Sequence, residues 1–366
     1  MRFVFKTSYD ADIRMFKHQS QAFWYLLLLV VAVALPFLID DYLIGEATLV
    51  LIWAICGMGL MILVGQSGQV SLGHAAFMAV GAYSNVIYQT QLGIPFILSF
   101  PLSGLTAGVA GAIIAMPTTK LHGIYLAIAT LAISVLAEDL IVILEPITGG
   151  VGGIFAPDIQ IFGFQFSRYG HPNELYWLVL VVTLLVLYFY RNIIRSPIGR
   201  AFSAVRDSEV SAKAMGVNVA RTKMIAFAVS CFITGLGGAL MGHFATVFTN
   251  ETFNIIISIT LLLMIVVGGL GSIHGAFFGA IIIGLLPLVI AFGRDGVAKM
   301  LGVGSITIPG LETAIFGGLL VIFILFEPLG IYGRWIKIRT YFSLFPFYRR
   351  DMFRRQKSYL KTERTR

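Results

Sequence analysis

Charged residues are scarce in this sequence, and their scarcity excludes an ordinary soluble globular protein. Lys, Arg, Asp and Glu make up 12% of the 366 residues, whereas 58% are hydrophobic and the mean hydropathy is +0.88. A typical soluble domain carries about 25% charged residues. With so little charge to cover a water-exposed surface, the chain is expected to be an integral membrane protein.

Motifs for covalent chemistry are also missing. The sequence has no GxxxxGKS/T nucleotide-binding loop, no HExxH, no GxSxG, and no cluster of acids and histidines at metal-ligand spacing. The two cysteines, Cys56 and Cys231, lie in apolar stretches without CxxC spacing, so we interpret them as small buried hydrophobes. We therefore expect no catalytic residue, no metal and no directly bound cofactor, and a membrane enzyme or scaffold is disfavoured.

Long apolar runs dominate what is present. A hydrocarbon core about 30 Å thick needs about 20 apolar residues per helix, and mostly polar residues before the first run disfavour a cleavable signal peptide. We predict an all-α polytopic fold with about ten membrane spans; merging the eighth and ninth would give nine. The predicted spans are 23–39, 43–64, 74–88, 96–116, 124–144, 175–190, 224–248, 254–267, 275–292 and 311–326.

The basic residues predict an orientation in the membrane. If both termini are cytoplasmic, 23 of the 26 Lys and Arg residues fall on the inside, as the positive-inside rule requires. This arrangement gives a cytoplasmic N-terminus 1–22, a membrane domain 23–330, and a basic cytoplasmic tail 331–366. The domain then has an external loop 145–174 and a cytoplasmic loop 191–223. The net charge of +8 thus needs no nucleic acid to explain it.

Two glycine-rich breaks resemble each other. GQSGQVSLG at 65–73 precedes His74, and GGLGSI at 268–273 precedes His274. The similarity suggests an internal duplication, with chance resemblance as the alternative. Irregular backbone persists in a bilayer only where protein or water satisfies its polar groups, so the breaks predict an internal cavity.

Polar residues in and near the spans are candidates for a translocation path. Uncharged donors and acceptors suit a solute that must pass without being trapped. The histidines could instead cap or pack, and Glu138, an acid in the outer third of its span, could reach the outer interface. The candidates are Gln66, Ser67, Gln69, Ser71, His74, Glu138 and His274.

The loop 191–223 is too polar to cross the membrane. Its Ala-rich middle predicts a short helix that ends at Gly216. Glu209, Ala212 and Met215, at i, i+3 and i+6, could dock this helix into a groove of a soluble subunit. Glu209→Arg is then expected to preserve folding and abolish energised uptake. The alternative is an ordinary basic loop.

Four motifs follow one another over roughly residues 40 to 330. They are GQSGQVSLGHAAFMAVG at 65–81, YLAIATLAIS with TGGVGGI within 121–154, GRAFSAVRDSEVSAKAMGVNVARTKMIAFAVS at 199–230, and VVGGLGSIHGAFFGA at 266–280. Together they resemble the permease family of branched-chain amino acid ABC importers. The segment 206–216 resembles the Glu-Ala-Ala…Gly loop of other ABC importers, but Ala212 stands where that loop has a neighbouring Ala-Ala, and Gly216 lies seven residues after Glu209. It also continues beyond residue 333, near which family members tend to stop; this tail could lie on the anionic inner leaflet or be disordered.

The resemblance implies a multi-pass subunit of the bacterial inner membrane that translocates branched-chain amino acids or similar solutes. Urea, short amides and aromatic acids are alternative substrates, and an ion-gradient-driven transporter or channel is the alternative mechanism. The resemblance further implies partner proteins: two ATPase subunits that use the ATP, a second homologous permease and a periplasmic substrate-binding protein. It also implies that the segment 206–216 couples to the ATPase, through Arg206, Asp207, Glu209, Ala212, Met215 and Gly216. The external loop, with Thr148, Gly149 and Gly150, would meet the binding protein or be a flexible connection.

Overall fold

The computed structural model describes residues 19–119, 121, 123–161, 163–300 and 330–344, with isolated positions between 310 and 325. In this part of the chain, seven helical stretches are long and apolar enough to cross a membrane. They are α3 (Asp41–Met61) with the π-helical turn η2 (Ile62–Gln66), α5 (Phe96–Thr118), α6 (Ile124–Ile143), α8 (Pro172–Arg195), α11 (Val219–Ala245), α12 (Ile255–Gly268) with the turn η4 (Asn250–Phe253), and α13 (Ile273–Met300).

Two other predicted spans form shorter helices. The first is α2 (Gln19–Ala34) followed by the turn η1 (Leu35–Phe37), and the third is α4 (His74–Thr90). The eighth and ninth spans are separate helices, because residues 269–272 interrupt α12 and α13. The predicted span 311–326 lies largely outside the described residues. The polytopic all-α class is therefore confirmed, while the count of ten stays a prediction.

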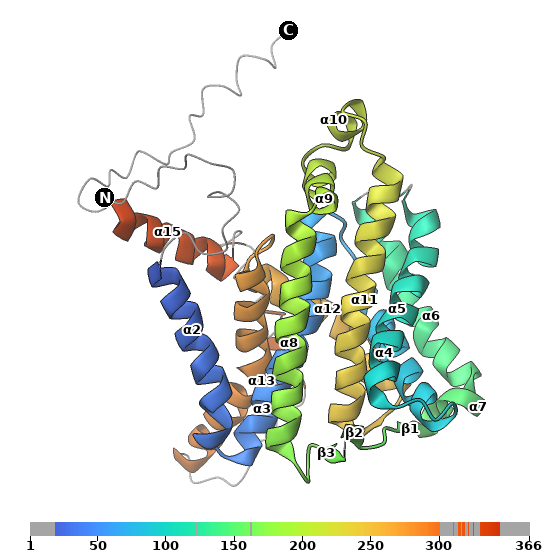
Figure 1. Cartoon of the computed structure of the whole chain (residues 1–366), viewed down its shortest axis with the longest axis vertical. Helices are drawn as coiled ribbons and strands as arrows, with labels where there is room; N and C mark the ends of the chain where they lie inside the picture. The colour runs from blue at the N-terminus through green and yellow to red at the C-terminus, as the bar shows by residue number, and fades with distance from the viewer. Residues whose placement is uncertain are drawn as a thin grey trace.

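The centre of the bundle is α11, which packs against α3, α4 and α5 (Figure 1). Glycines allow the helices to approach closely: a Cβ at Gly81 of α4 would overlap the Gly235 carbonyl of α11, and a Cβ at Gly238 would overlap the Met78 carbonyl. Membrane helices associate through such small-residue contacts because lipid supplies no hydrophobic driving force between them. The core is thus held by backbone proximity as well as apolar side chains.

The two ends of the bundle carry different structures (Figure 1). At one end lie the short helices α9 (Pro197–Asp207) and α10 (Glu209–Ala214). At the other end lie α7 (Glu145–Thr148), the turn η3 (Gly150–Gly152), and the strands β1 (Ile154–Phe155), β2 (Ile159–Ile161) and β3 (Phe164–Phe166). β1 pairs with β4 (Val247–Phe248), which follows α11, and β2 pairs with β3, both antiparallel. The predicted loops 191–223 and 145–174 are therefore at opposite ends.

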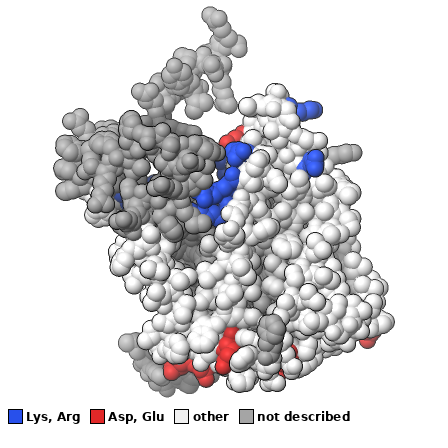
Figure 2. Space-filling model, in the orientation of Figure 1, with Lys and Arg blue, Asp and Glu red and all other residues white. Residues whose placement is uncertain are grey.

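Charge is segregated between these ends. On the face shown in Figure 2, Lys and Arg side chains gather near α9 and α10, and Asp and Glu side chains gather mainly at the opposite end. The helix α15 (Gly330–Leu344) lies across the basic end, against α12 and α13. The tail prediction for 331–366 thus falls partly on α15, and residues 345–366 lie outside the described part of the chain.

Candidate functional site

The segment between α8 and α11 folds into two short helices whose starts are capped by its own side chains. Ser196 Oγ accepts a hydrogen bond from the Gly199 amide at 3.3 Å, and Ser208 Oγ accepts one from the Ser211 amide at 3.2 Å. Gly216 follows α10 with φ +84°, a conformation that glycine adopts readily. The single helix expected from the sequence is therefore two helices, because the Ser208 side chain caps a new start.

The inner side of α10 is anchored to the bundle. Glu209 Oε1 lies 2.6 Å from Nζ of Lys223, near the start of α11, and the Lys223 side chain is only 4% exposed. Ala212, one turn along α10, is buried. Two of the three residues expected to dock on a soluble partner thus face the helix bundle, since Glu209 neutralises a buried cation and Ala212 packs inward.

The outer side of α10 exposes apolar side chains. Val210 is 82% exposed and Met215, directly after the helix, is 85% exposed. Both lie at the end of the molecule from which α10 projects (Figure 1). Exposed apolar side chains at a projecting tip are typical of a contact with another protein. Met215 was a sequence candidate for this contact, whereas Val210 was not.

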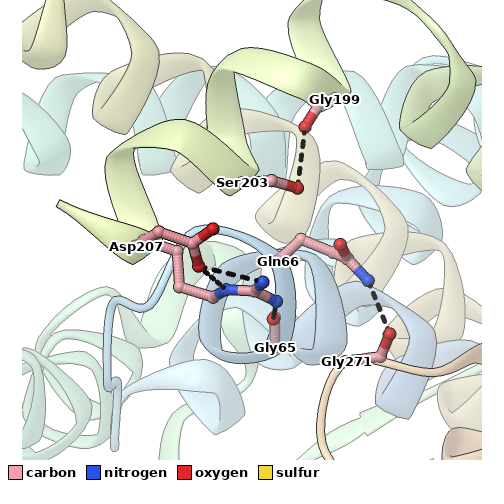
Figure 3. Close-up of polar contacts among 7 residues, drawn as sticks. Gly65, Gln66, Gly199, Ser203, Asp207 and Gly271 are labelled. Carbon is pink, nitrogen blue, oxygen red and sulfur yellow. Dashed lines mark hydrogen bonds and ion pairs between the residues drawn. The ribbon is translucent and has the colours of Figure 1, made fainter. Parts of the chain in front are cut away.

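Arg206 reaches from α9 to the end of α3. Its Nε and Nη2 both lie 3.1 Å from Asp207 Oδ1, and its Nη1 donates to the Gly65 carbonyl oxygen at 2.9 Å (Figure 3). Because one carboxylate oxygen holds two guanidinium nitrogens, the planar group is oriented with its remaining nitrogen toward Gly65. The predicted coupling segment is thereby joined directly to the first glycine break.

The two glycine breaks meet. Gln66 Nε2 donates to the Gly271 carbonyl oxygen at 2.9 Å (Figure 3), and a Cβ at Gly65 would lie 2.7 Å from the Gly271 amide nitrogen. The Gly271 amide in turn donates to Met61 Sδ at 3.1 Å. Residues more than 200 positions apart therefore form one junction, at the end of the bundle that carries α9.

A pocket of about 130 Å³ lies between the first break, the start of α6 and the α9–α10 segment. Ser67 and Gln69 line it, and both are engaged: Gln69 Nε2 donates to Ser67 Oγ at 2.8 Å and to the Lys223 carbonyl at 3.3 Å. Ser67 Oγ donates to the Leu63 carbonyl at 2.8 Å. The predicted cavity at the break is thus small, and it adjoins the Glu209–Lys223 pair.

Ser71 and His74 form a second polar group at the start of α4. Ser71 Oγ lies 3.0 Å from His74 Nδ1, His74 Nε2 lies 2.8 Å from Ser230 Oγ, and Ser230 Oγ donates to the Gly59 carbonyl at 2.6 Å. Since the Ser230 proton goes to Gly59, His74 Nε2 is the donor to Ser230, and Nδ1 accepts from Ser71. This neutral imidazole ties α4 to α11 and α3.

The comparison with known families identifies the family to which this bundle belongs. Residues 42–324 match the family described as the permease component of the branched-chain amino acid transport system. The chain belongs to this family. The match covers the whole of the bundle from α3 through the described part of α13, including both breaks and the α9–α10 segment.

Curated relatives carry names of the same kind. The permease is 31% identical to the high-affinity branched-chain amino acid transport system permease protein LivM of Escherichia coli K12, over 85% of this chain and 75% of the relative. It is 27% identical to a probable LivM of Methanocaldococcus jannaschii, over 78% and 84%. A fructose import permease, FrcC of Rhizobium meliloti, is 38% identical over 36% and 37% of the two chains. No solved structure matches the chain significantly.

His274 of the permease lies apart from His74, in a different environment. The Tyr25 hydroxyl is hydrogen-bonded to its Nε2 at 2.6 Å, and the Tyr332 ring stacks parallel to it at 5.1 Å. These contacts join α2, α13 and α15. The structure thus does not bring the two histidines together, and His274 makes its contacts beside the second break.

Glu138 lies in the last two turns of α6, toward the end that leads into the loop 145–174. Its carboxylate lies near the Ile255 amide, at the start of α12, and Asp139 and Glu251 are its charged neighbours. Its Oε1 is buried without a hydrogen-bond partner among the described residues. A carboxylate near a helix N-terminus is stabilised by the amide groups and the dipole there, and the helix N-terminus beside Glu138 is that of α12.

The external loop is closely folded at the predicted residues. Thr148 Oγ1 donates to the Ile141 carbonyl at 2.6 Å and accepts from the Gly150 amide at 3.2 Å. Gly149 and Gly150 have φ of +76° and +55°, which explains glycine at both positions. The Ala156 amide donates to the Thr246 carbonyl at 2.8 Å, so the loop is tied to the end of α11.

The sequence analysis missed a polar cluster beside this loop. His243 Nδ1 donates to the Pro157 carbonyl at 3.0 Å, its Nε2 lies 2.8 Å from Asn85 Oδ1, and Gln89 Nε2 donates to the same Asn85 oxygen at 2.6 Å. The sequence analysis also did not identify Lys223 as the ion-pair partner of Glu209. Asn85 and Gln89 are four positions apart, and hence on one face of α4, which was the available signal. Their partner His243 comes from a distant segment that spacing cannot identify.

Proposed function

We propose that this chain is the membrane-spanning permease subunit of an ATP-driven importer in a bacterial inner membrane, and that it carries branched-chain amino acids or solutes of similar size. Family membership supports the transport class. The names of the LivM relatives support the substrate class. The exposed tip of α10 is the observation that supports ATP-driven coupling.

The tip has the features of a docking element. Glu209 and Ala212 hold α10 on the bundle from within, while Val210 and Met215 are left almost fully exposed on the outside. An anchored helix with an apolar exposed side can seat in a groove of a soluble subunit. Because the permease lacks a nucleotide-binding loop of its own, the ATP would be bound and hydrolysed by two partner ATPases.

The charge distribution supports a cytoplasmic location for this tip. Lys and Arg side chains gather at the α9–α10 end (Figure 2), and cytoplasmic faces of membrane proteins are enriched in them. Both termini would then be cytoplasmic, and the folded external loop would face the periplasm and a substrate-binding protein. A second, homologous permease would complete the pore.

In this function the permease performs no covalent chemistry. Closure and opening of the ATPase dimer would move α10, the α9–α10 segment would carry that movement to the bundle, and the broken helices would alternate access. Ser67, Gln69 and Ser71 would belong to the cytoplasmic half of this path. Selectivity among solutes would depend largely on the binding protein.

The test is reconstitution of the complete complex in proteoliposomes with ATP inside and labelled leucine with its binding protein outside. We expect uptake only with ATP and with all subunits present. Val210→Asp with Met215→Asp should abolish co-purification of the ATPases and ATP-dependent uptake, because both charges would be buried in the docking groove. Tyr169→Asp, at a similarly exposed position on the opposite end, should retain the ATPases.

Uptake by the purified chain alone, driven by an ion gradient, would overturn the proposal. Full retention of the ATPases by the double variant would remove α10 from the docking surface. Replacing leucine with urea, a short amide, an aromatic acid or fructose in the same assay would identify the substrate class.

A further inference from the structure

The junction of the glycine breaks contains two side-chain hydrogen bonds in series. Arg206 of α9 donates to the Gly65 carbonyl, and the next residue, Gln66, donates to the Gly271 carbonyl of the second break. Each bond crosses between elements that are far apart in sequence. Ser203, one turn earlier in α9, instead donates within its own helix to the Gly199 carbonyl at 3.3 Å (Figure 3).

Both accepting carbonyls lie at interruptions of membrane helices. Gly65 is inside the π-helical turn that ends α3, where the Ser67 amide donates to the Ile62 carbonyl at 3.1 Å. Gly271, with φ +81°, lies in the short connection between α12 and α13. Carbonyls at such interruptions lack the regular helical donor and require another one within a bilayer. Here the donors are the side chains of Arg206 and Gln66, so these hydrogen bonds can break and re-form without unfolding a helix.

The bonds are supported by close packing on both sides. A Cβ at Gly68 would lie 3.0 Å from Arg206 Cγ, so the first break and α9 are in direct contact. The closeness of Gly65 to the Gly271 backbone holds the two breaks against each other. A displacement of α9 can therefore act on Gly65 through the Arg206 hydrogen bond and the contact at Gly68, and a displacement of Gly65 can act on Gly271.

We infer that Arg206 and Gln66 are positioning residues that transmit movement of the coupling segment to both broken helices at once, so that the junction is the mechanical input to the cytoplasmic gate. This inference rests on the proposed function. It assigns to Arg206 a role inside the permease, separate from contact with the ATPase. A purely structural cap would stabilise α3 in all states and would not affect how much solute is imported per ATP.

The experiment compares Arg206→Gln, Gln66→Met and Arg200→Gln in the complete reconstituted complex. Arg200→Gln is the matched control, because Arg200 lies in the same helix and its Nη1 donates to the Arg195 carbonyl at 3.3 Å, away from the breaks. We expect the first two variants to retain the ATPases and ATP hydrolysis but to import about tenfold less solute per ATP, the effect of losing one well-aligned hydrogen bond to a gating equilibrium. The control should remain within about twofold of the wild type.

A second measurement reports on the accessibility of the second glycine break, through cysteine labelling at position 270. Leu270, in the second break, is exposed, and the native Cys56 and Cys231 are buried. Leu270→Cys should change its rate of labelling by a maleimide when the ATPases are trapped with ATP and vanadate. Arg206→Gln should remove this change, and Arg200→Gln should preserve it.

Two results would overturn the inference. One is equal import per ATP in Arg206→Gln and Arg200→Gln. The other is a nucleotide-dependent change at residue 270 that survives Arg206→Gln. Failure of the wild-type complex to couple ATP to uptake would instead overturn the proposed function, so the two failures are distinguishable.

Discussion

Lys223 is a cation held inside the protein by a carboxylate from another helix. Its side chain is 4% exposed, whereas that of its partner Glu209 is 36% exposed. Removing Glu209 should lower the free energy of unfolding more than removing Lys223 does. Without Glu209, the buried Lys223 has neither water nor a counter-ion. Glu209→Arg would place a second cation beside Lys223, so it is unsuitable as a test of docking alone.

This asymmetry gives a prediction at the residue scale. Glu209→Gln should lower the free energy of unfolding by about 3 kcal/mol, because it leaves Lys223 buried without its carboxylate. Lys223→Met should cost less, since the more exposed Glu209 can be hydrated. Thermal unfolding of the purified protein in detergent measures both.

The double variant Glu209→Gln with Lys223→Met is the control for this pair. It should be more stable than Glu209→Gln alone, since no buried cation remains. If all three variants unfold at the wild-type temperature, the ion pair makes no contribution to stability.

At the scale of the elements, the glycine contacts between α4 and α11 decide how closely the helices cross. Gly81→Ala would put a methyl group onto the Gly235 carbonyl, so the helices must separate, at a cost of about 2 kcal/mol. Gly45→Ala is the matched change in α3, where nothing lies within 4 Å of the new Cβ and alanine is the better helix former. We expect a lower unfolding temperature for Gly81→Ala and no loss for Gly45→Ala. Equal unfolding temperatures for the two variants would show that α4 and α11 can move apart without loss of stability.

Helix boundaries show which elements could be predicted. Apolar length identified the spans from α3 to α13 to within about five residues, because a bilayer demands long apolar helices, although α13 continues to Met300, eight residues beyond the predicted end. The split between α9 and α10 was not predicted, since one serine side chain determines it. The fold of the external loop was also not predicted, because its strand β1 pairs with β4, a segment that follows α11.

At the scale of the whole molecule, the proposed orientation can be tested with the exposed ends. Met215→Cys at the tip of α10 and Tyr169→Cys at the opposite end are both strongly exposed, and the native cysteines are buried. A membrane-impermeant maleimide should label Tyr169→Cys in intact spheroplasts, and Met215→Cys only after permeabilisation, because the basic end is expected to be cytoplasmic. Labelling of Met215→Cys from outside would exclude contact with a cytoplasmic ATPase.

A polytopic helical membrane protein could be predicted from the amino-acid sequence, and the ordered motifs indicated a permease. Apolar runs, the bias of basic residues and the ordered motifs are local properties, and they depend only on neighbouring positions along the chain. Three features depend on tertiary packing: Gly65 and Gly271 lie at one junction, Glu209 forms an ion pair with Lys223, and Val210 is exposed. These contacts join segments that are distant in sequence, so they exist only once the helices have packed.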